Sequence, residues 1–350
     1  MANYATSVLA KGQAIVTQRN QAPEQRRKIP TVMELALKNQ EYSIPNAVEL
    51  RKSDKRPVEI YYQTKVAQQS TTTKAYNHTG TYGDSGKVEL VYVTHVETFS
   101  LPRKIAQNNV LTYQNMFNNL YEEKWRNIRN RHDTSALAFL IANRMQLAAS
   151  VVNPQIASAN PGTWNDTNYA LEIDQTKRSR FIQMVKSFMA ALYFTGEYDI
   201  VSDLQSAAEF EFQMNQGAGN QANTSFQFGN AVISTTQDAV SSDYALGAVL
   251  AMPRRSFAGM YWNDALNKSG SVNSGETEVG TLGTQRDPFG SGAVADVSMY
   301  TQRADTSANT TGGSTQDVVD QWELALTIAY ALPPLALTGD SVVHLIGQAA

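Results

Sequence analysis

The chain has 350 residues, of which 42% are hydrophobic and 17% are charged, so it is long enough for about two domains or one domain with long insertions. It has no cysteine, which excludes a disulfide scaffold, a thiolate zinc site and a cysteine nucleophile. No apolar run reaches the ~18 residues of a membrane-spanning helix, and the opening residues lack the apolar segment of a signal peptide. We therefore expect a globular protein that acts without secretion and without a membrane.

Charge is divided unevenly along the chain. Residues 1–196 contain 24 Lys+Arg and 15 Asp+Glu, a net charge of +9, whereas residues 197–350 contain 5 and 17, a net charge of −12; together they give the overall −3. This asymmetry favours a molecule with two electrostatically different ends or faces, one of them suited to a polyanion. Chance clustering, or two domains of different composition, is the alternative, since no basic run is denser than Arg26-Arg27-Lys28.

Residues 1–54 have the polar composition of an arm rather than of a core. Within them, Thr31-Val-Met-Glu34 has the form of a capping box that opens a short helix ending near Lys38. Tyr42–Leu50 is expected to be extended, because Pro45 interrupts it. With few apolar clusters, the arm is expected to gain order by lying on other material.

A projecting β loop is predicted next. Val58–Val66 and Lys87–Glu97 are rich in β-forming residues and are expected to pair as a hairpin. The polar connection between them, Gln68–Gly86, is far longer than the two to five residues or so of a tight turn. In the second strand, one face is expected to carry Val88, Leu90, Tyr92, Thr94 and Val96. Pairing with a neighbouring molecule would explain why the strands extend so far.

A long helical tract follows from Val110 to Val152, which contains neither Gly nor Pro and has apolar residues at helical spacing. Asn130–Asp133 is expected to interrupt it, with Asp133 as the cap of a second segment. Four arginines are predicted to form a basic face: Arg126, Arg129, Arg131 and Arg144. A solvated face crossed by salt bridges is the alternative.

The rest of the chain alternates between helices and strands. We expect helices over Asp174–Phe194 and Asp203–Met214, and a polar surface loop over Asn267–Gly292. Strong alternation predicts a strand that buries Trp322, Leu324, Leu326, Ile328, Tyr330 and Leu332. Other strands are expected at Ser225–Phe228, Ala231–Ser234, Ala293–Gln302 and Val342–Ile346, and the apolar run Tyr244–Met252 is stopped by Pro253.

Motifs that carry enzyme chemistry are absent from the sequence. Five residues, instead of four, separate Gly80 from Gly86-Lys87, so this is not a phosphate loop. Gly290-Ser-Gly292 follows Asp287-Pro288-Phe289 rather than a strand, which argues against a dinucleotide site. The four histidines are scattered without metal-ligand spacing, and no nucleophile elbow or nucleic-acid-binding module is present. We therefore expect no catalytic residue, no metal and no cofactor.

In chain order, a polar arm, a projecting β loop, a long helix, a mixed middle region and returning strands resemble a tailed-bacteriophage major capsid protein of the Hong Kong 97 type. Gln216–Phe228 and Tyr244–Pro253 are also similar to this group. The resemblance implies an α+β fold, which divides as 1–54 N-terminal arm, 55–99 extended loop, 100–152 spine helix of the peripheral domain, 153–292 axial domain, 293–334 peripheral return strands and 335–350 C-terminal axial strand.

The resemblance also implies a function and its partners. The chain would assemble with copies of itself into hexamers and pentamers of an icosahedral shell around packaged double-stranded DNA, as a virion protein assembled in the host cytoplasm. Further partners would be a portal and separate scaffold or cement proteins. The DNA-facing basic residues would be Arg26, Arg27, Lys28, Arg126, Arg129 and Arg131, and the inter-subunit loop would carry Lys74, Tyr76 and Tyr82. Some relatives join a loop lysine covalently to a neighbour, but no residue here identifies a partner for Lys74.

Other classes of protein remain open at this point. An encapsulin-like shell has the same fold and differs in its contents. A jelly-roll coat needs about eight short strands and no long helical tract, and a tail-tube protein would lack the long helix. A cytoplasmic hydrolase or transferase with unrecognised motifs would show turnover in the purified subunit.

Overall fold

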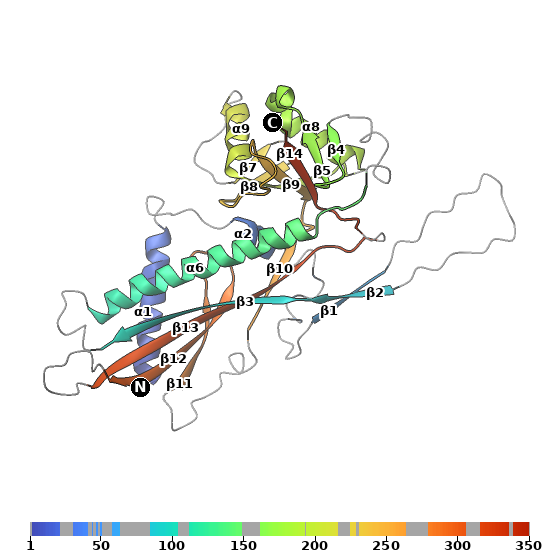
Figure 1. The fold of residues 1–350 in the computed structure, drawn as a ribbon. Helices are drawn as coiled ribbons and strands as arrows, with labels where there is room; N and C mark the ends of the chain where they lie inside the picture. The colour runs from blue at the N-terminus through green and yellow to red at the C-terminus, as the bar shows by residue number, and fades with distance from the viewer. Residues whose placement is uncertain are drawn as a thin grey trace.

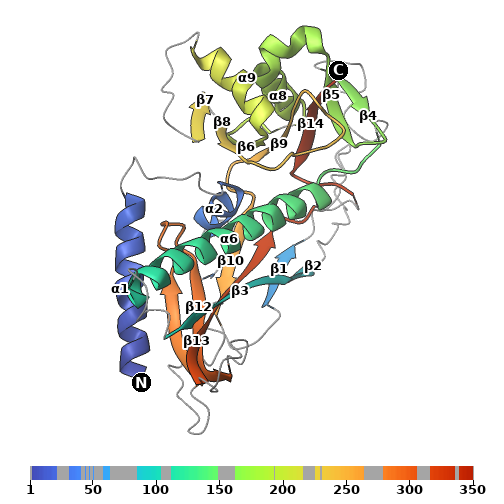
Figure 2. The ribbon, with the colours of Figure 1, turned by 60° about the vertical axis from the view of Figure 1, so that its left-hand side comes forward.

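The computed structural model describes residues 2–21, 31–40, 44, 47, 50, 58–63, 85–103, 112–148, 162–192, 194–215, 225–228, 231–263, 279–305, 316–335 and 339–349. These residues form two units, each built on one β-sheet (Figures 1 and 2). We call them the five-strand unit and the seven-strand unit. A long helix lies between them.

The five-strand unit is antiparallel and centred on its longest strand. Its strands are β3 (Tyr92–Pro102), β10 (Ala258–Trp262), β11 (Val279–Arg286), β12 (Val294–Asp305) and β13 (Gln316–Ala331). β3 pairs along one edge of β13, while β12 and then β10 pair along the other. The predicted buried face of β13 is confirmed from Trp322 to Tyr330, and Gln321 and Glu323 opposite are exposed. From Thr327 to Ala331 both faces are buried, and Leu332 is wrong as a member of the strand, because it follows the strand's end and is only partly buried.

The long helix α6 (Tyr113–Ala142) crosses one face of this sheet. Its thirty residues span about 45 Å at 1.5 Å per residue. Thr112 caps its first turn by accepting a hydrogen bond from the Asn115 amide. The predicted interruption at Asn130–Asp133 is wrong: the helix runs through it, because the Asp133 carboxylate caps a different helix, as shown below. The helix also ends ten residues before the predicted Val152.

Two N-terminal helices pack on the long helix. The predicted short helix is confirmed as α2 (Thr31–Lys38). In contrast, α1 (Ala2–Gln21) was not predicted, since the arm was expected to lie on other material. It buries Ala5, Val8, Leu9 and Val16 in the core of its own subunit.

The projecting hairpin is present but shorter than predicted. β1 (Val58–Gln63) pairs antiparallel with β2 (Ser85–Leu90), in a two-stranded sheet of their own. The prediction of one strand from Lys87 to Glu97 is wrong, because the strand breaks at Val91 and β3 joins β13 instead. The buried face also changes at this break: Leu90 is buried in β2, but Glu97, Phe99 and Leu101 are buried in β3, and Val96 is 43% exposed.

The seven-strand unit has the order β4-β5-β14-β9-β6-β8-β7. Its strands are β4 (Thr163–Asn165), β5 (Ala170–Ile173), β6 (Tyr198–Ser202), β7 (Ser225–Phe228), β8 (Ala231–Thr235), β9 (Ala248–Pro253) and β14 (His344–Gln348). One face carries the turn η2 (Gln175–Arg180) and the helices α8 (Phe181–Ala191) and α9 (Leu204–Asn215). The predicted helices and short strands of this region are confirmed within a few residues, except that the first predicted helix begins as a 3₁₀ turn.

The chain passes from the seven-strand unit to the five-strand unit between β9 and β10, and returns before β14. The predicted domain boundary at residue 292 does not coincide with this crossing, because β10 and β11 precede that residue and belong to the five-strand sheet. The predicted loop Asn267–Gly292 likewise contains β11. Gly283 provides the irregularity that this strand needs, with φ of +85° at a register shift against β12.

Candidate functional site

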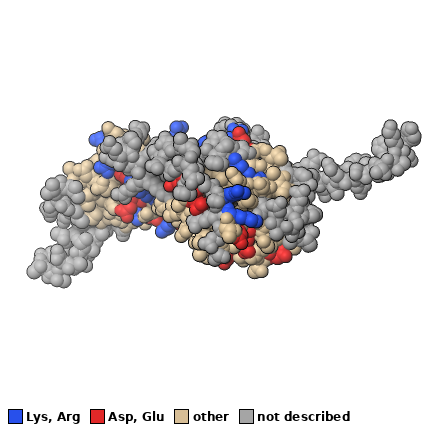
Figure 3. All heavy atoms as spheres, turned by 90° about the horizontal axis from the view of Figure 1, so that it is seen from above, with Lys and Arg blue, Asp and Glu red and all other residues tan. Residues whose placement is uncertain are grey.

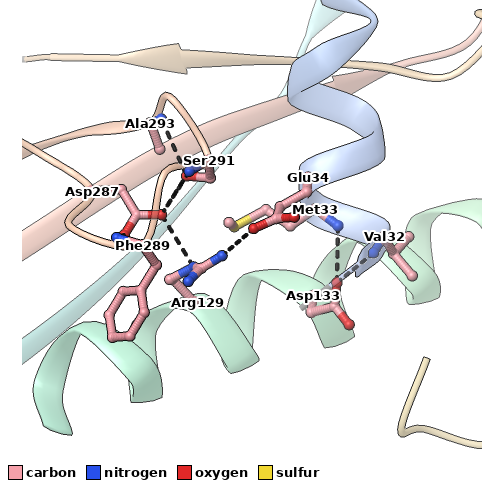
Figure 4. A network of polar contacts seen from close by, with 9 residues as sticks. All are labelled: Val32, Met33, Glu34, Arg129, Asp133, Asp287, Phe289, Ser291 and Ala293. Carbon is pink, nitrogen blue, oxygen red and sulfur yellow. Dashed lines mark hydrogen bonds and ion pairs between the residues drawn. The ribbon is translucent and has the colours of Figure 1, made fainter. Parts of the chain in front are cut away.

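A buried polar network joins three segments that are distant in sequence (Figure 4). Arg129 of α6 lies at its centre and is 1% exposed. Its Nη2 donates to the Glu34 carboxylate of α2, and its Nε lies 3.1 Å from Oδ2 of Asp287, as an ion pair rather than an aligned hydrogen bond. The guanidinium also lies 4.8 Å from the centre of the Phe289 ring. One cation therefore holds the N-terminal segment and the β11–β12 loop against the long helix.

The β11–β12 loop is shaped by Asp287. Its Oδ1 accepts from the Phe289 amide at 2.9 Å, and its Oδ2 accepts from the Ser291 hydroxyl. The Asp287 amide in turn donates to the Ala293 carbonyl at 2.9 Å. This Asx turn fixes the orientation of the Asp287 carboxylate that faces Arg129.

Asp133 caps α2 from the side of α6. Its Oδ1 accepts from the backbone amides of Val32 at 2.8 Å and Met33 at 2.9 Å. A carboxylate at a helix N-terminus satisfies unpaired amides and interacts favourably with the helix dipole. The cap chemistry predicted for Asp133 is therefore correct, but it acts on another helix than its own.

Burial changes the acidity of both carboxyl groups that hold α2. Burial raises the pKa of Glu34 to about 7, against the opposing effect of Arg129. Burial also raises the pKa of Asp133 to about 6, although the amides of Met33 and Val32 lower it. Both groups therefore bind protons more tightly in the folded chain than in the unfolded one.

The structure separates the arginines predicted to face DNA. Arg129 is enclosed and bound to two carboxylates, so its prediction as a DNA-facing residue is wrong. Arg126 is partly buried, pairs with Glu122 and lies over the Phe289 ring. The Arg131 side chain is 58% exposed, and its Nη2 lies 3.2 Å from Glu97. Salt bridges therefore cross the predicted basic face, and among these three arginines only Arg131 has a side chain that is more than half exposed.

Several predicted site residues fall outside the part of the chain that the structure describes. These are Arg26, Arg27 and Lys28 of the predicted arm, and Lys74, Tyr76 and Tyr82 of the predicted inter-subunit loop. Arg144, from the predicted basic face, donates instead to the Ile141 and Asn168 carbonyls where α6 meets the seven-strand unit.

Among the described residues, β1 and β2 form a two-stranded ribbon at the N-terminal end of β3 (Figure 1). On one face, the Glu59 carboxylate accepts from Tyr61 Oη and Lys87 Nζ, each at 2.7 Å. On the other face, the Tyr62 ring lies over Gly86, where a Cβ would be 2.5 Å from the ring. Tyr61 is 73% exposed, so the ribbon carries an aromatic ring to the surface.

The base of this ribbon packs on its own subunit. Leu90 is buried, and Ile60 packs beside it, in a cluster on the outer face of the five-strand sheet. The same cluster contains Ile44 and Ala47 from the N-terminal segment and Trp262 of β10. The base is therefore fixed, while Tyr61, beyond it, stays exposed among the residues that the structure describes.

The charge on the surface is mixed in the view from above, where Lys and Arg lie beside Asp and Glu (Figure 3). Within the described ranges, no helix is long and apolar enough to cross a membrane. In the same ranges, no three His, Cys, Asp or Glu side chains gather as metal ligands.

Solved structures match this chain over most of its length. The structure titled "Mycobacterium phage Che8" matches with 12% identity, a TM-score of 0.50 and coverage of 90% of both chains. The chain therefore has the α+β Hong Kong 97-type fold, and this prediction is confirmed. "Capsid of Ralstonia phage GP4" matches at 11% identity, with 85% and 84% of the chains covered and a TM-score of 0.45. "Capsid structure of the Cyanophage P-SCSP1u" matches at 8% identity, with 90% and 88% covered and a TM-score of 0.47. No family model matches the sequence, and no curated protein does.

The anchor residues Glu34, Asp133 and Asp287 were not predicted as a group. Each has a local signal: Glu34 and Asp133 stand in capping patterns, and the Asp-Pro-Phe-Gly-Ser run from Asp287 is typical of an Asx turn. Nothing in the sequence pairs that turn with Arg129, because the two are 158 positions apart.

Proposed function

We propose that the chain is a major capsid protein that assembles with its own copies into hexamers and pentamers of a closed icosahedral shell around double-stranded DNA. The fold is consistent with this role, and it is the fold that the sequence resemblance predicted. In this proposal the protein acts as a structural component of a virion and carries out no catalysis.

The observation that carries the proposal is the β1–β2 ribbon. An isolated pair of strands is at best marginally stable in water and needs a further strand or a packing surface. Beyond its base, this ribbon finds neither among the described residues of its own subunit. A neighbouring copy supplies such a surface in a shell, where repeated heterologous contacts join identical subunits.

Packaged DNA is proposed as a nonspecific partner of the exposed basic side chains on α6, with Arg131 as the best placed. Such contacts neutralise phosphates without reading sequence. A portal and separate scaffold or cement proteins complete the proposed set of partners.

Electron microscopy of the expressed full chain tests the proposal. Closed particles or hexameric capsomers are expected, and a stable monomer that never assembles at high concentration would contradict it. Analysis of the particle contents then separates a DNA-filled virion from a cellular compartment that encloses protein cargo.

A ribbon variant makes the test specific. Tyr61→Ser removes the exposed ring with little effect on the subunit fold, so assembled particles are expected to decrease strongly in sedimentation while circular dichroism stays unchanged. Thr98→Ser, on the exposed side of β3, is the matched control and is expected to assemble normally. Equal assembly of both variants would show that the exposed ring of the ribbon makes no contact with a neighbour.

A further inference from the structure

The short helix α2 is enclosed by its own subunit. It lies where the long helix and the two sheet units meet (Figure 2). Its five apolar side chains are all buried: Val32, Met33, Leu35, Ala36 and Leu37. A helix of eight residues is too short to be stable in water alone, so the surrounding contacts hold it in this form.

On one side, α2 packs closely on the five-strand unit. Gly259 of β10 faces it, and a Cβ at this position would lie 3.1 Å from the Cβ of Ala36. Just beyond the helix, Asn39 Nδ2 donates to the Phe257 carbonyl at 3.1 Å. The backbone of β10 and the helix therefore leave no space for a larger side chain between them.

On the other side, α2 contacts the seven-strand unit at β8. Asn39 also lies near the Asp199 carboxylate of β6 and helps to lower its pKa against the larger effect of burial, and that carboxylate accepts from the Arg255 amide at 2.9 Å. Asn39 thus contacts both units at the point where the chain passes from one to the other.

Asp133 forms a second connection between the units. Besides capping α2, its Oδ2 lies 3.5 Å from the Thr236 hydroxyl, which follows β8 in the seven-strand unit. Next to it on α6, Thr134 Oγ1 donates to Asp238 Oδ2 at 2.6 Å. The seat of α2 is therefore made of residues from both units and from the long helix.

We propose that α2, packed between α6, β8 and β10, acts as a wedge: it fixes the angle between the two units, and displacing it from these contacts allows the angle to vary. The N-terminal segment then acts within its own subunit as a conformational element. This inference does not depend on the proposed assembly or on DNA.

Two spin labels, one on each unit, report changes in the angle as changes in the distance between them, and they can be placed at single sites because the chain has no cysteine. Val96→Cys in the five-strand unit and Leu204→Cys in the seven-strand unit place one label on each, at positions 43% and 54% exposed. The labelled full chain, diluted into unlabelled chain, is expected to give a single narrow distance.

Two unrelated changes displace the wedge. Asp133→Ala removes the acceptor of both α2 amides together with the Thr236 contact, whereas Gly259→Val pushes on the opposite side of the helix and leaves both in place. Each is expected to broaden the distance distribution or add a second distance, with loss of amide-exchange protection in residues 32–37. Asp133→Asn keeps an acceptor oxygen and is expected to restore the narrow distance.

A control separates displacement of the wedge from general loss of stability. Phe188→Leu opens a cavity beneath α8, away from α2 and from the labelled helix α9, and is expected to leave the distance unchanged. If both Asp133→Ala and Gly259→Val remain folded by circular dichroism and keep the narrow distance of the parent, the proposal is overturned. A distance broadened as much in Phe188→Leu would also contradict the proposal, because loss of core packing away from α2 would then be enough to change the angle.

Discussion

At the residue scale, Arg129 shows how one buried cation can fix an otherwise weakly held segment. Its guanidinium faces the carboxylates of Glu34 and Asp287, and burial of such groups is tolerated only while they remain paired. The Arg129→Met variant would leave both carboxylates without their cation. We expect it to lower the free energy of unfolding by about 3–5 kcal/mol, measured by urea denaturation of the dissociated subunit.

Arg254 is the control for this prediction. Its ion pair with Glu197 is accessible to solvent on both sides, so Arg254→Met is expected to cost only about 0.5 kcal/mol. Equal losses in the two variants would mean that the buried network contributes no more than a surface pair.

His344 gives a pH-dependent prediction. It is fully buried in β14 against the rings of Phe188 and Phe194, and burial lowers its pKa to about 3. Since the unfolded pKa is about 6.5, its contribution to stability is present above pH 6.5 and is lost as the pH falls toward 3. Between pH 6.5 and 4 the loss is about 3 kcal/mol for this residue.

The His344→Leu variant should therefore be less sensitive to acid than the parent. The difference between their urea midpoints is expected to grow in favour of the variant from pH 7 to pH 4. His132, whose pKa burial lowers to about 4, changes stability in the same direction, whereas Glu34 and Asp133 act oppositely, because their raised pKa values remove stability as the pH rises. Comparing variant with parent at each pH cancels these other groups. A constant difference between the midpoints would contradict the prediction.

At the element scale, the contact between α1 and α6 depends on a glycine. A Cβ at Gly12 would lie 2.5 Å from Cε1 of Phe117, which is fully buried. Helix propensity alone would make Gly12→Ala stabilising by about 1 kcal/mol, but overpacking costs about 1–3 kcal/mol. We expect a net lower melting temperature and faster amide exchange in α1.

Gly196→Ala is the matched control, because nothing lies within 4 Å of a Cβ at that position. It is expected to leave the melting temperature unchanged or slightly higher, through the smaller entropy of its unfolded chain. Faster exchange in α1 in this control would show that the effect is not local to the helix contact.

Elements with a strong local pattern were predictable from the sequence, and those defined by distant partners were not. The alternation in β13 and the helix-start pattern Thr31-Val-Met-Glu34 are both local signals, although in the structure Glu34 binds Arg129 and Asp133 supplies the cap. The break at Val91 has no local signal, because the residues on both sides favour a strand, and only the separate pairings with β1 and β13 divide them. The same holds for Asp133, whose cap chemistry was visible but whose partner helix was not.

At the scale of the whole molecule, the charge division along the sequence does not become two separate bodies. The seven-strand unit combines β4, β5 and α8 from the basic half with β6 to β9 and α9 from the acidic half. The five-strand unit likewise combines β3 and α6 with β10 to β13. The uneven charge along the sequence therefore predicted a polyanion-binding surface but not its position in the fold. That position depends on how the segments interleave and on which charged side chains form internal ion pairs.

Contact with DNA can be tested at Arg131, the exposed arginine of α6. Arg131→Gln removes one phosphate contact, so affinity is expected to fall equally for unrelated duplex sequences. The slope of log K against log salt is expected to decrease by about 0.9, measured by fluorescence anisotropy with the dissociated subunit. Lys87→Gln is the control, because Lys87 is similarly exposed, at 55%, and also pairs with one carboxylate, but lies on the β1–β2 ribbon. If both variants reduce the slope equally, binding reflects overall charge, and α6 has no special part in it.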